Sequence, residues 1–282
     1  AAVAPAQPTF LPGGTPMPHL RTLAIRALAL AGASVVLAAA PAGAQRLPTA
    51  EQVVARHLQA IGGRQALNAQ QYRHTRQELS WQGEGLTAIA DVYQSREGNR
   101  FVMKMDAPNM GATSMGYDGQ TRWSSDPVSG PRIRHDSVRG AALNQFDFEW
   151  NMNFARAFQS METVGRDTVN GESCIAVRMV AASGHQVVNC FADDDGLLIG
   201  ATIRLLSSAD PIEIRMTFSD YRVFSGIKMP TLTTVFTALD GQVREIMGGD
   251  LRSEMRVVSV STEPIDASVF ALPAEVAALK QD

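Results

Sequence analysis

The residues able to do chemistry are few and scattered in this sequence. Beyond residue 44 there are four histidines, and none is spaced with another histidine or a cysteine as a pair of metal ligands: His57, His74, His135 and His185. The run 193–196, Asp-Asp-Asp-Gly, resembles the start of a calcium loop, but the remaining ligands and the closing glutamate are missing. The sequence also lacks a nucleophile elbow, a zinc-protease helix motif and a phosphate-binding loop. We therefore expect no catalytic residue, no metal and no cofactor.

The two cysteines, Cys174 and Cys190, are too few for a disulfide-built scaffold. They lie on two consecutive predicted strands, 173–181 and 186–192, and a turn centred near residue 182 would set them opposite each other. In an oxidising compartment such a pair persists as a disulfide. Two buried free thiols are the alternative, because a free cysteine packs as a small hydrophobic residue.

The N-terminal region has the order of a secretory signal. Arg21 and Arg26 precede the uncharged, Ala- and Leu-rich run 27–40, and Ala42-Gly43-Ala44 has the small-x-small pattern of a cleavage site. The run is shorter than the roughly 20 residues that span a bilayer. A buried Ala-rich helix is the alternative. We expect residues 1–16 to be a misassigned upstream segment, residues 17–44 to be a signal peptide, and 45–282 to be the mature, periplasmic protein. Because residue 45 is Gln, we expect no lipid anchor.

The elements that position the remaining residues begin with a short helical region. Thr49 and Gln52 fit a capping box, and Gly62-Gly63 ends the predicted helix. A second short helix is expected over 64–68.

From Tyr72 onward the hydrophobic period is two, which is typical of strands with one apolar face. The alternating apolar positions include Ile199, Ala201, Ile203 and Leu205, and Asn-Gly or Asp-Gly pairs at 170, 118, 195 and 240 predict hairpin turns between the strands. Residues 141–158 are expected to form one or two helices, and 273–280 a last one. The fold class is therefore mainly β with a few helices, in a single domain covering 45–282.

An antiparallel sheet with one apolar face must bury that face. The predicted helices are too few to cover it, so we expect the sheet to curve around a ligand cavity. The residues predicted to line this apolar cavity are Phe101, Met103, Met105, Ile203, Ile214, Met216 and Phe218. Methionine suits such a surface because it is flexible and polarisable, although it also fills gaps in ordinary cores. Tyr117 and Trp123 flank one hairpin turn and are expected to form a cross-strand pair, and a position at the mouth of the cavity is the alternative.

Several segments, in order along the chain, resemble the LolA-like family of periplasmic proteins, which are described as outer-membrane lipoprotein-sorting or carrier-like. They are the segments 56–63, 116–123, 164–171, 218–226, 228–230 and 264–270, which include Gly116-Tyr-Asp-Gly-Gln-Thr-Arg-Trp123 and Pro264-Ile-Asp-Ala-Ser-Val-Phe270. The resemblance implies a strongly curved, incomplete β-barrel of about eleven strands, closed by helices. It also implies an apolar interior that holds acyl chains.

We therefore expect a carrier or binding protein, not an enzyme, that shelters lipid or the acyl chains of a lipoprotein and hands them to a membrane or a membrane-bound partner. An envelope-stress sensor module that binds a regulatory protein is the alternative. Such sensors usually have a further C-terminal domain, which is not expected here. An enzyme on the same fold is a more remote alternative. The 25 basic against 28 acidic residues give no reason to expect nucleic acid as a partner.

Overall fold

The computed structural model describes residues 46–82, 85–108, 111–134, 148, 154, 158–181, 184–205, 212–238 and 251–280. The predicted signal peptide, the segment before it, the Asp240-Gly241 turn and nearly all of the predicted helical region 141–158 lie outside these residues. Residues 46–282 form one compact unit.

Two helices open the described chain. Helix α1 (Ala50–Ala60) begins at Thr49, whose side chain accepts a hydrogen bond from the Gln52 amide while the Gln52 side chain accepts one from the Thr49 amide. The predicted capping box is thereby confirmed. Helix α2 (Gly63–Ala69) follows after Gly62. Its predicted position is also confirmed.

All the described strands form one antiparallel sheet of thirteen strands, two more than expected. Their order across the sheet is β6-β5-β4-β3-β2-β1-β13-β12-β11-β10-β9-β8-β7, so neighbours in sequence are mostly neighbours in space. The strands are β1 (Tyr72–Trp81), β2 (Leu86–Ser95), β3 (Arg100–Ala107), β4 (Gly111–Tyr117), β5 (Arg122–Asp126), β6 (Gly130–Ile133), β7 (Ser160–Val169), β8 (Glu172–Val180), β9 (Gln186–Ala192), β10 (Leu198–Leu205), β11 (Ile212–Phe224), β12 (Ile227–Ala238) and β13 (Leu251–Ser261).

Turn chemistry explains why consecutive strands pair. Between β7 and β8 the chain reverses at Asn170 and Gly171, which both have positive φ, 51° and 87°. A two-residue turn of this kind matches the twist of the strands that it joins. The predicted turns at Asp118-Gly119 and Asp195-Gly196 also lie between paired strands.

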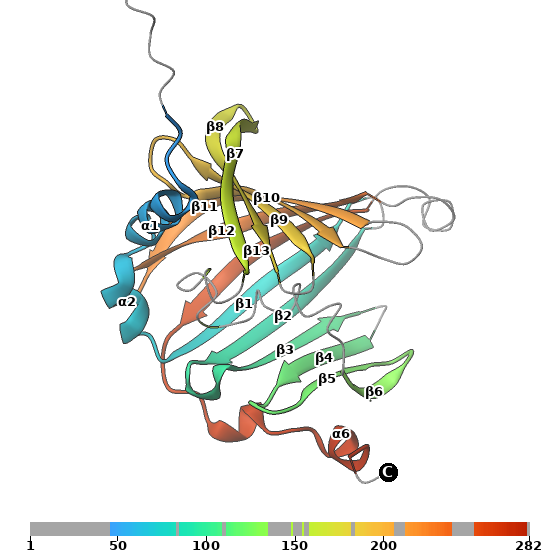
Figure 1. The fold of residues 1–282 in the computed structure, drawn as a ribbon. Helices are drawn as coiled ribbons and strands as arrows, with labels where there is room; N and C mark the ends of the chain where they lie inside the picture. The colour runs from blue at the N-terminus through green and yellow to red at the C-terminus, as the bar shows by residue number, and fades with distance from the viewer. Residues whose placement is uncertain are drawn as a thin grey trace, which may run out of the picture. The chain divides into compact units, whose positions relative to one another are not determined.

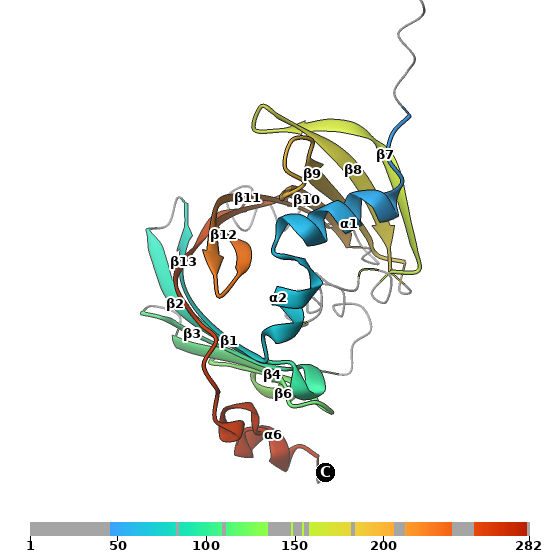
Figure 2. The ribbon, with the colours of Figure 1, turned by 90° about the vertical axis from the view of Figure 1, so that its left-hand side faces the viewer.

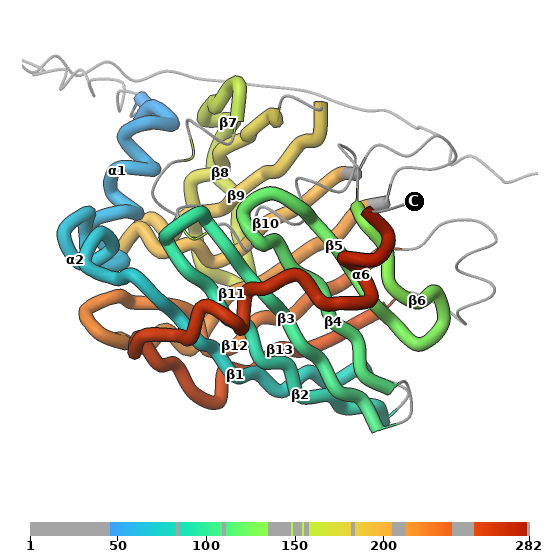
Figure 3. Tube along the Cα trace, turned by 90° about the horizontal axis from the view of Figure 1, so that it is seen from below, coloured from blue at the N-terminus to red at the C-terminus, as the bar shows by residue number. Residues whose placement is uncertain are grey.

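The sheet is open and strongly curved (Figures 1 and 2), and helices α1 and α2 lie on its concave side. We call the face toward these helices the inner face and the other the outer face. On the outer face, the 3-10 helix Ala267–Phe270 and helix α6 (Ala274–Ala278) run past strands β3 to β6 (Figure 3). There Phe270 and Val276 are buried against Val102 and Trp123.

Two sequence interpretations are wrong at the level of single residues. A bulge between Leu198 and Gly200 shifts the register of β10, so Ile199 packs with the cysteine cluster on the outer face, away from Ile203. Tyr117 and Trp123 do not form a cross-strand pair, because Gly116 is the residue opposite Trp123. The two aromatic side chains therefore point to opposite faces of the sheet.

Candidate ligand-binding face

The inner face of the sheet collects apolar residues from strands that are far apart in sequence. On β10 and β11, Ile203 is opposite Ile214, and Met216 and Phe218 follow at the spacing of two that keeps side chains on one face. The register continues through Val235, Met255, Leu79 and Ala88 to β3. There Met103 and Met105 are opposite Val92 and Ala90. The structure thus places all seven residues predicted to line a cavity on the inner face.

Helix α1 covers only one end of this face. Val53, Val54 and Leu58 pack with Val177, Met179 and Phe191 of β8 and β9 in the main buried cluster. Of the seven residues, Ile203 alone packs against this cluster. Helix α1 thus fills the β7–β10 end, and helix α2, which also lies inside the curve (Figure 2), contacts the sheet at β12.

His57 anchors the covered end. It is only 3% exposed, and its Nδ1 lies 3.1 Å from the carbonyl oxygen of Gly196. A carbonyl can only accept, so Nδ1 donates and the ring is the Nδ1–H tautomer when neutral. Burial is the main cause that lowers the pKa of His57 to about 4. The centroid of the neutral ring lies 5.1 Å from that of the Phe191 ring, so His57 is a packing residue.

The central part of the inner face is apolar and half-buried. Ile214, Met216 and Phe218 are neither buried nor fully exposed, and they belong to none of the three buried clusters of described residues. Further half-buried apolar residues on this face that the sequence analysis missed are Leu79, Trp81, Leu86, Met115, Val235, Leu251 and Met255. Trp81 and Leu79 alternate with polar residues, so the period of two could have found them.

Phe101 differs from the other six residues because it is 2% exposed. It lies on the inner face opposite Gln94, which is 5% exposed, at the end of the sheet near helix α2. The side chains of Met103 and Met105, farther along β3, are half-buried. Access to this face therefore increases along β3 from Phe101 toward Met105.

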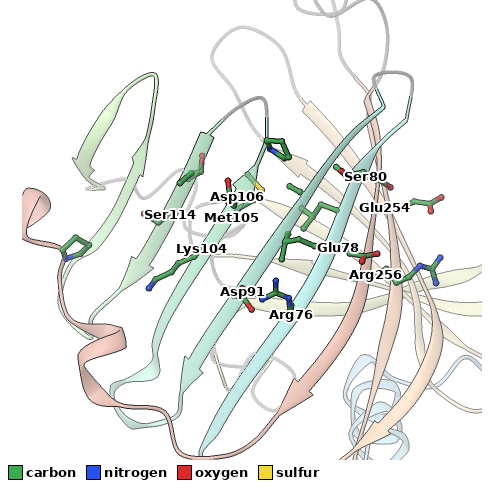
Figure 4. Close-up of a pocket in the computed structure, with 18 of the residues that line it drawn as sticks. Arg76, Glu78, Ser80, Asp91, Lys104, Met105, Asp106, Ser114, Glu254 and Arg256 are labelled. Carbon is green, nitrogen blue, oxygen red and sulfur yellow. Dashed lines mark hydrogen bonds and ion pairs between the residues drawn. The ribbon is translucent and has the colours of Figure 1, made fainter.

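A hollow of about 1190 Å³ lies elsewhere, mainly on the outer face of β1–β4 and β13 (Figure 4). Its lining includes five acidic and three basic side chains, among them Asp91, Lys104 and Arg256. Arg76 and His74 both contact Asp91, at 3.0 Å and 2.8 Å. Met105 is the only one of the seven predicted residues that reaches it. This open, charged surface does not offer the dry surroundings that an apolar ligand needs, so we take the inner face as the candidate site.

The structure offers little for metal chemistry in the part of the chain that it describes, where no group of three or more His, Cys, Asp or Glu side chains is arranged to hold an ion. Within the described ranges, no helix combines the length and the apolar character needed to cross a lipid bilayer.

No known family profile and no curated protein matches the sequence. Solved structures do match the fold. A LolA superfamily protein from Nitrosomonas europaea has a TM-score of 0.54 at 13% identity, with 80% of this chain and 99% of that chain covered. A DUF1329 family protein from Desulfovibrio piger has a TM-score of 0.52 at 13% identity, with 79% and 97% covered. A putative outer membrane lipoprotein-sorting domain from Vibrio parahaemolyticus gives 0.48 at 10% identity, with 77% and 97% covered. The chain therefore has a LolA-like fold, as the sequence resemblance implies.

Proposed function

We propose that this protein is a periplasmic carrier that shelters an apolar ligand, the acyl chains of a lipid or lipoprotein, on the inner face of its curved sheet. One observation supports this most strongly. The central inner face presents a continuous set of half-buried apolar side chains, from Ile214 and Met216 across the sheet to Met103 and Met105, that lie outside the buried clusters of described residues. Contiguous apolar surface that stays partly accessible to solvent is typical of an interaction site.

Binding on this face involves no covalent step. The free energy of binding would come from removing apolar surface from water, at roughly 25 cal/mol per Å². Release would need transfer of the ligand to a membrane or to a membrane-bound partner, because exposing the acyl chain to water costs free energy. We propose the periplasm as the compartment because of the signal-like order in residues 17–44.

Native mass spectrometry of the protein purified from its own cell envelope, followed by lipid extraction, tests both parts of the proposal. We expect a protein mass that begins at Gln45, together with a co-purifying lipid or acylated peptide. A protein that retains residues 17–44 would contradict the export step. A ligand-free protein that also takes up no lipid when incubated with envelope extract would contradict the carrier function.

A further inference from the structure

The inner face is chemically graded from one end of the strands to the other. At the end near helix α2, the transverse row of paired residues is Arg73, Gln94, Phe101, Tyr117 and Arg122 on β1 to β5. Two residues farther along the strands, the row contains Val92, Met103 and Met115, and the far end contains Leu79, Trp81 and Leu86. The eight steps from Arg73 to Trp81 span about 27 Å at the rise of an antiparallel strand. On β1 to β4 the face is thus basic at one end and mainly apolar toward the other, and on β5 and β6 it carries the Asp126–Arg132 ion pair.

Arg73 lies on the inner face at the basic end of β1, between the side chains of Gln94 and Phe148. Its Nε donates to the side-chain oxygen of Gln94 at 2.9 Å, and its guanidinium carbon lies 5.1 Å from the centroid of the Phe148 ring. Arg96 lies over the same ring at 4.9 Å. Burial and the neighbouring Arg96 charge lower the pKa of Arg73 to about 10, so the guanidinium still carries its charge at neutral pH.

Arg122 and Arg134 continue the basic row on β5 and just beyond β6. Arg122 lies over the ring of Tyr117 at 4.7 Å, and its Nη1 atom is buried without a hydrogen-bond partner. Arg134 donates from Nε to the Ser124 hydroxyl at 3.1 Å. Among the residues that the structure describes, no carboxylate forms an ion pair with Arg73, Arg122 or Arg134. A buried N–H without a partner is costly and calls for an acceptor.

From this arrangement we infer that the ligand is an anionic amphiphile, whose phosphate or carboxylate group binds the arginine band of Arg73, Arg122 and Arg134 while its acyl chain lies along Met103, Met105 and Met115. Guanidinium groups suit both head groups, because they pair with either in a charge-assisted, bidentate way. The inference rests on the proposed function and adds the class of the head group to it.

Arg96 is less suitable for a test. It donates to the carbonyl oxygens of Leu67 and Gln70, at 2.6 Å and 3.0 Å, and so ties helix α2 to the sheet. Within the described part of the chain, the side chains of Arg73 and Arg122 make no such contacts with backbone carbonyls. Arg76 provides a matched control, because it lies on the same strand as Arg73 but on the outer face, paired with Asp91.

The test is displacement of the uncharged fluorescent probe N-phenyl-1-naphthylamine by three ligands with the same twelve-carbon chain: dodecyl phosphate, laurate and dodecanol. We expect at least one of the two anions to displace the probe roughly tenfold more tightly than dodecanol at low salt, the size of one strong charge-assisted contact. The tighter of the two anions identifies phosphate or carboxylate as the head group. Arg73→Gln or Arg122→Gln should reduce this preference to less than about threefold, whereas Arg76→Gln should keep it.

The outcomes separate the two proposals. Probe uptake by the wild-type protein with equal displacement by all three ligands would overturn the anionic head group and leave the carrier function standing. An anion preference that survives in both Arg73→Gln and Arg122→Gln, with normal melting of both variants, would overturn the assignment to the arginine band. If the wild-type protein takes up no probe and binds none of the three ligands in calorimetry, the proposed function fails, and this inference fails with it.

Discussion

At the scale of single residues, His57 links the packing of the molecule to pH. Its pKa is lowered to about 4 in the folded protein, against 6.5 for a free side chain, and burial is the main cause. Between these two values the unfolded chain binds a proton that the folded protein does not. The stabilisation from the neutral ring is therefore fully present above pH 6.5 and is lost as the pH falls toward 4.

We expect the free energy of unfolding to fall by about 2 kcal/mol from this residue between pH 7 and pH 5. Urea unfolding at the two pH values measures it. In His57→Gln, which can still donate to the Gly196 carbonyl, overall stability should be lower but this part of the pH dependence should disappear. An identical pH dependence in wild type and His57→Gln would show that His57 is already protonated in the folded protein or exposed to water.

Gly62 lies between helices α1 and α2, where the chain approaches the turn between β11 and β12. It has a φ of 121°, and a Cβ added there would lie 2.3 Å from the carbonyl oxygen of Gly226 in the β11–β12 turn. The Lys228 amide donates to the Ile61 carbonyl at 2.9 Å beside it. This close approach of two backbones fixes the α1–α2 corner on the sheet.

Gly62→Ala should therefore destabilise the protein by about 3 kcal/mol, from backbone strain plus the displacement of the β11–β12 turn. The control is Gly85→Ala, because Gly85 also has a positive φ, 61°, but no atom lies within 4 Å of its added Cβ. We expect about 1 kcal/mol for this control. Thermal and urea unfolding of both variants compares them, and equal losses would mean that the contact with Gly226 does not matter.

At the scale of elements, the strands β8 and β9 are joined by Cys174 and Cys190, whose sulfurs are bonded in the structure with a Cα–Cα distance of 5.5 Å. The two residues are diagonal neighbours, since Cys174 is opposite Ala192 and Cys190 is opposite Ala176. Closing a loop of this length stabilises a fold by about 3 kcal/mol in the chain-entropy model. We expect Cys174→Ala/Cys190→Ala to lose a similar amount. Thiol titration of the unfolded, unreduced protein should find no free thiol, and finding two would exclude the bond.

Local signals in the sequence predict elements well here, and non-local packing explains what they miss. The Thr49 capping box and the Asn170-Gly171 turn depend on a few adjacent residues, so the sequence is enough to predict them. At the β10 bulge, a Cβ on Gly200 would lie 2.9 Å from the Val169 side chain of β7 and 3.5 Å from the Met216 carbonyl oxygen of β11, surroundings that no local pattern contains. The same holds for Trp123, whose side chain packs against Phe270 from the C-terminal segment.

The candidate site also combines features that a local sequence pattern predicts with features that arise only from the pairing of distant strands. The period of two identified which residues share a face, and the register of the sheet places all seven on its inner side. The sequence does not predict the arginine band, because Arg73 and Arg122 are 49 positions apart in the chain and share one transverse row only through the pairing of five strands.

At the scale of the whole molecule, the two faces of one curved sheet differ in chemical character, and the proposed carrier function depends on this difference. The inner face presents apolar residues that the described helices cover only in part, and the outer face presents charged residues and the C-terminal segment. If the inner face binds ligand, it must tolerate contact with water when the ligand leaves. A packed core would not tolerate it.

Met216 and Thr217 test this claim most directly, because they are adjacent on β11 and lie on opposite faces. The measurement is uptake of N-phenyl-1-naphthylamine by Met216→Asp, Thr217→Asp and wild type, with the melting temperature of each. We predict that Met216→Asp lowers uptake roughly tenfold or more while its melting temperature stays within about 4 °C of wild type. Thr217→Asp should keep both. A collapsed melting temperature for Met216→Asp, together with no uptake by the wild type, would show that the inner face is an ordinary packed core and would contradict the carrier function.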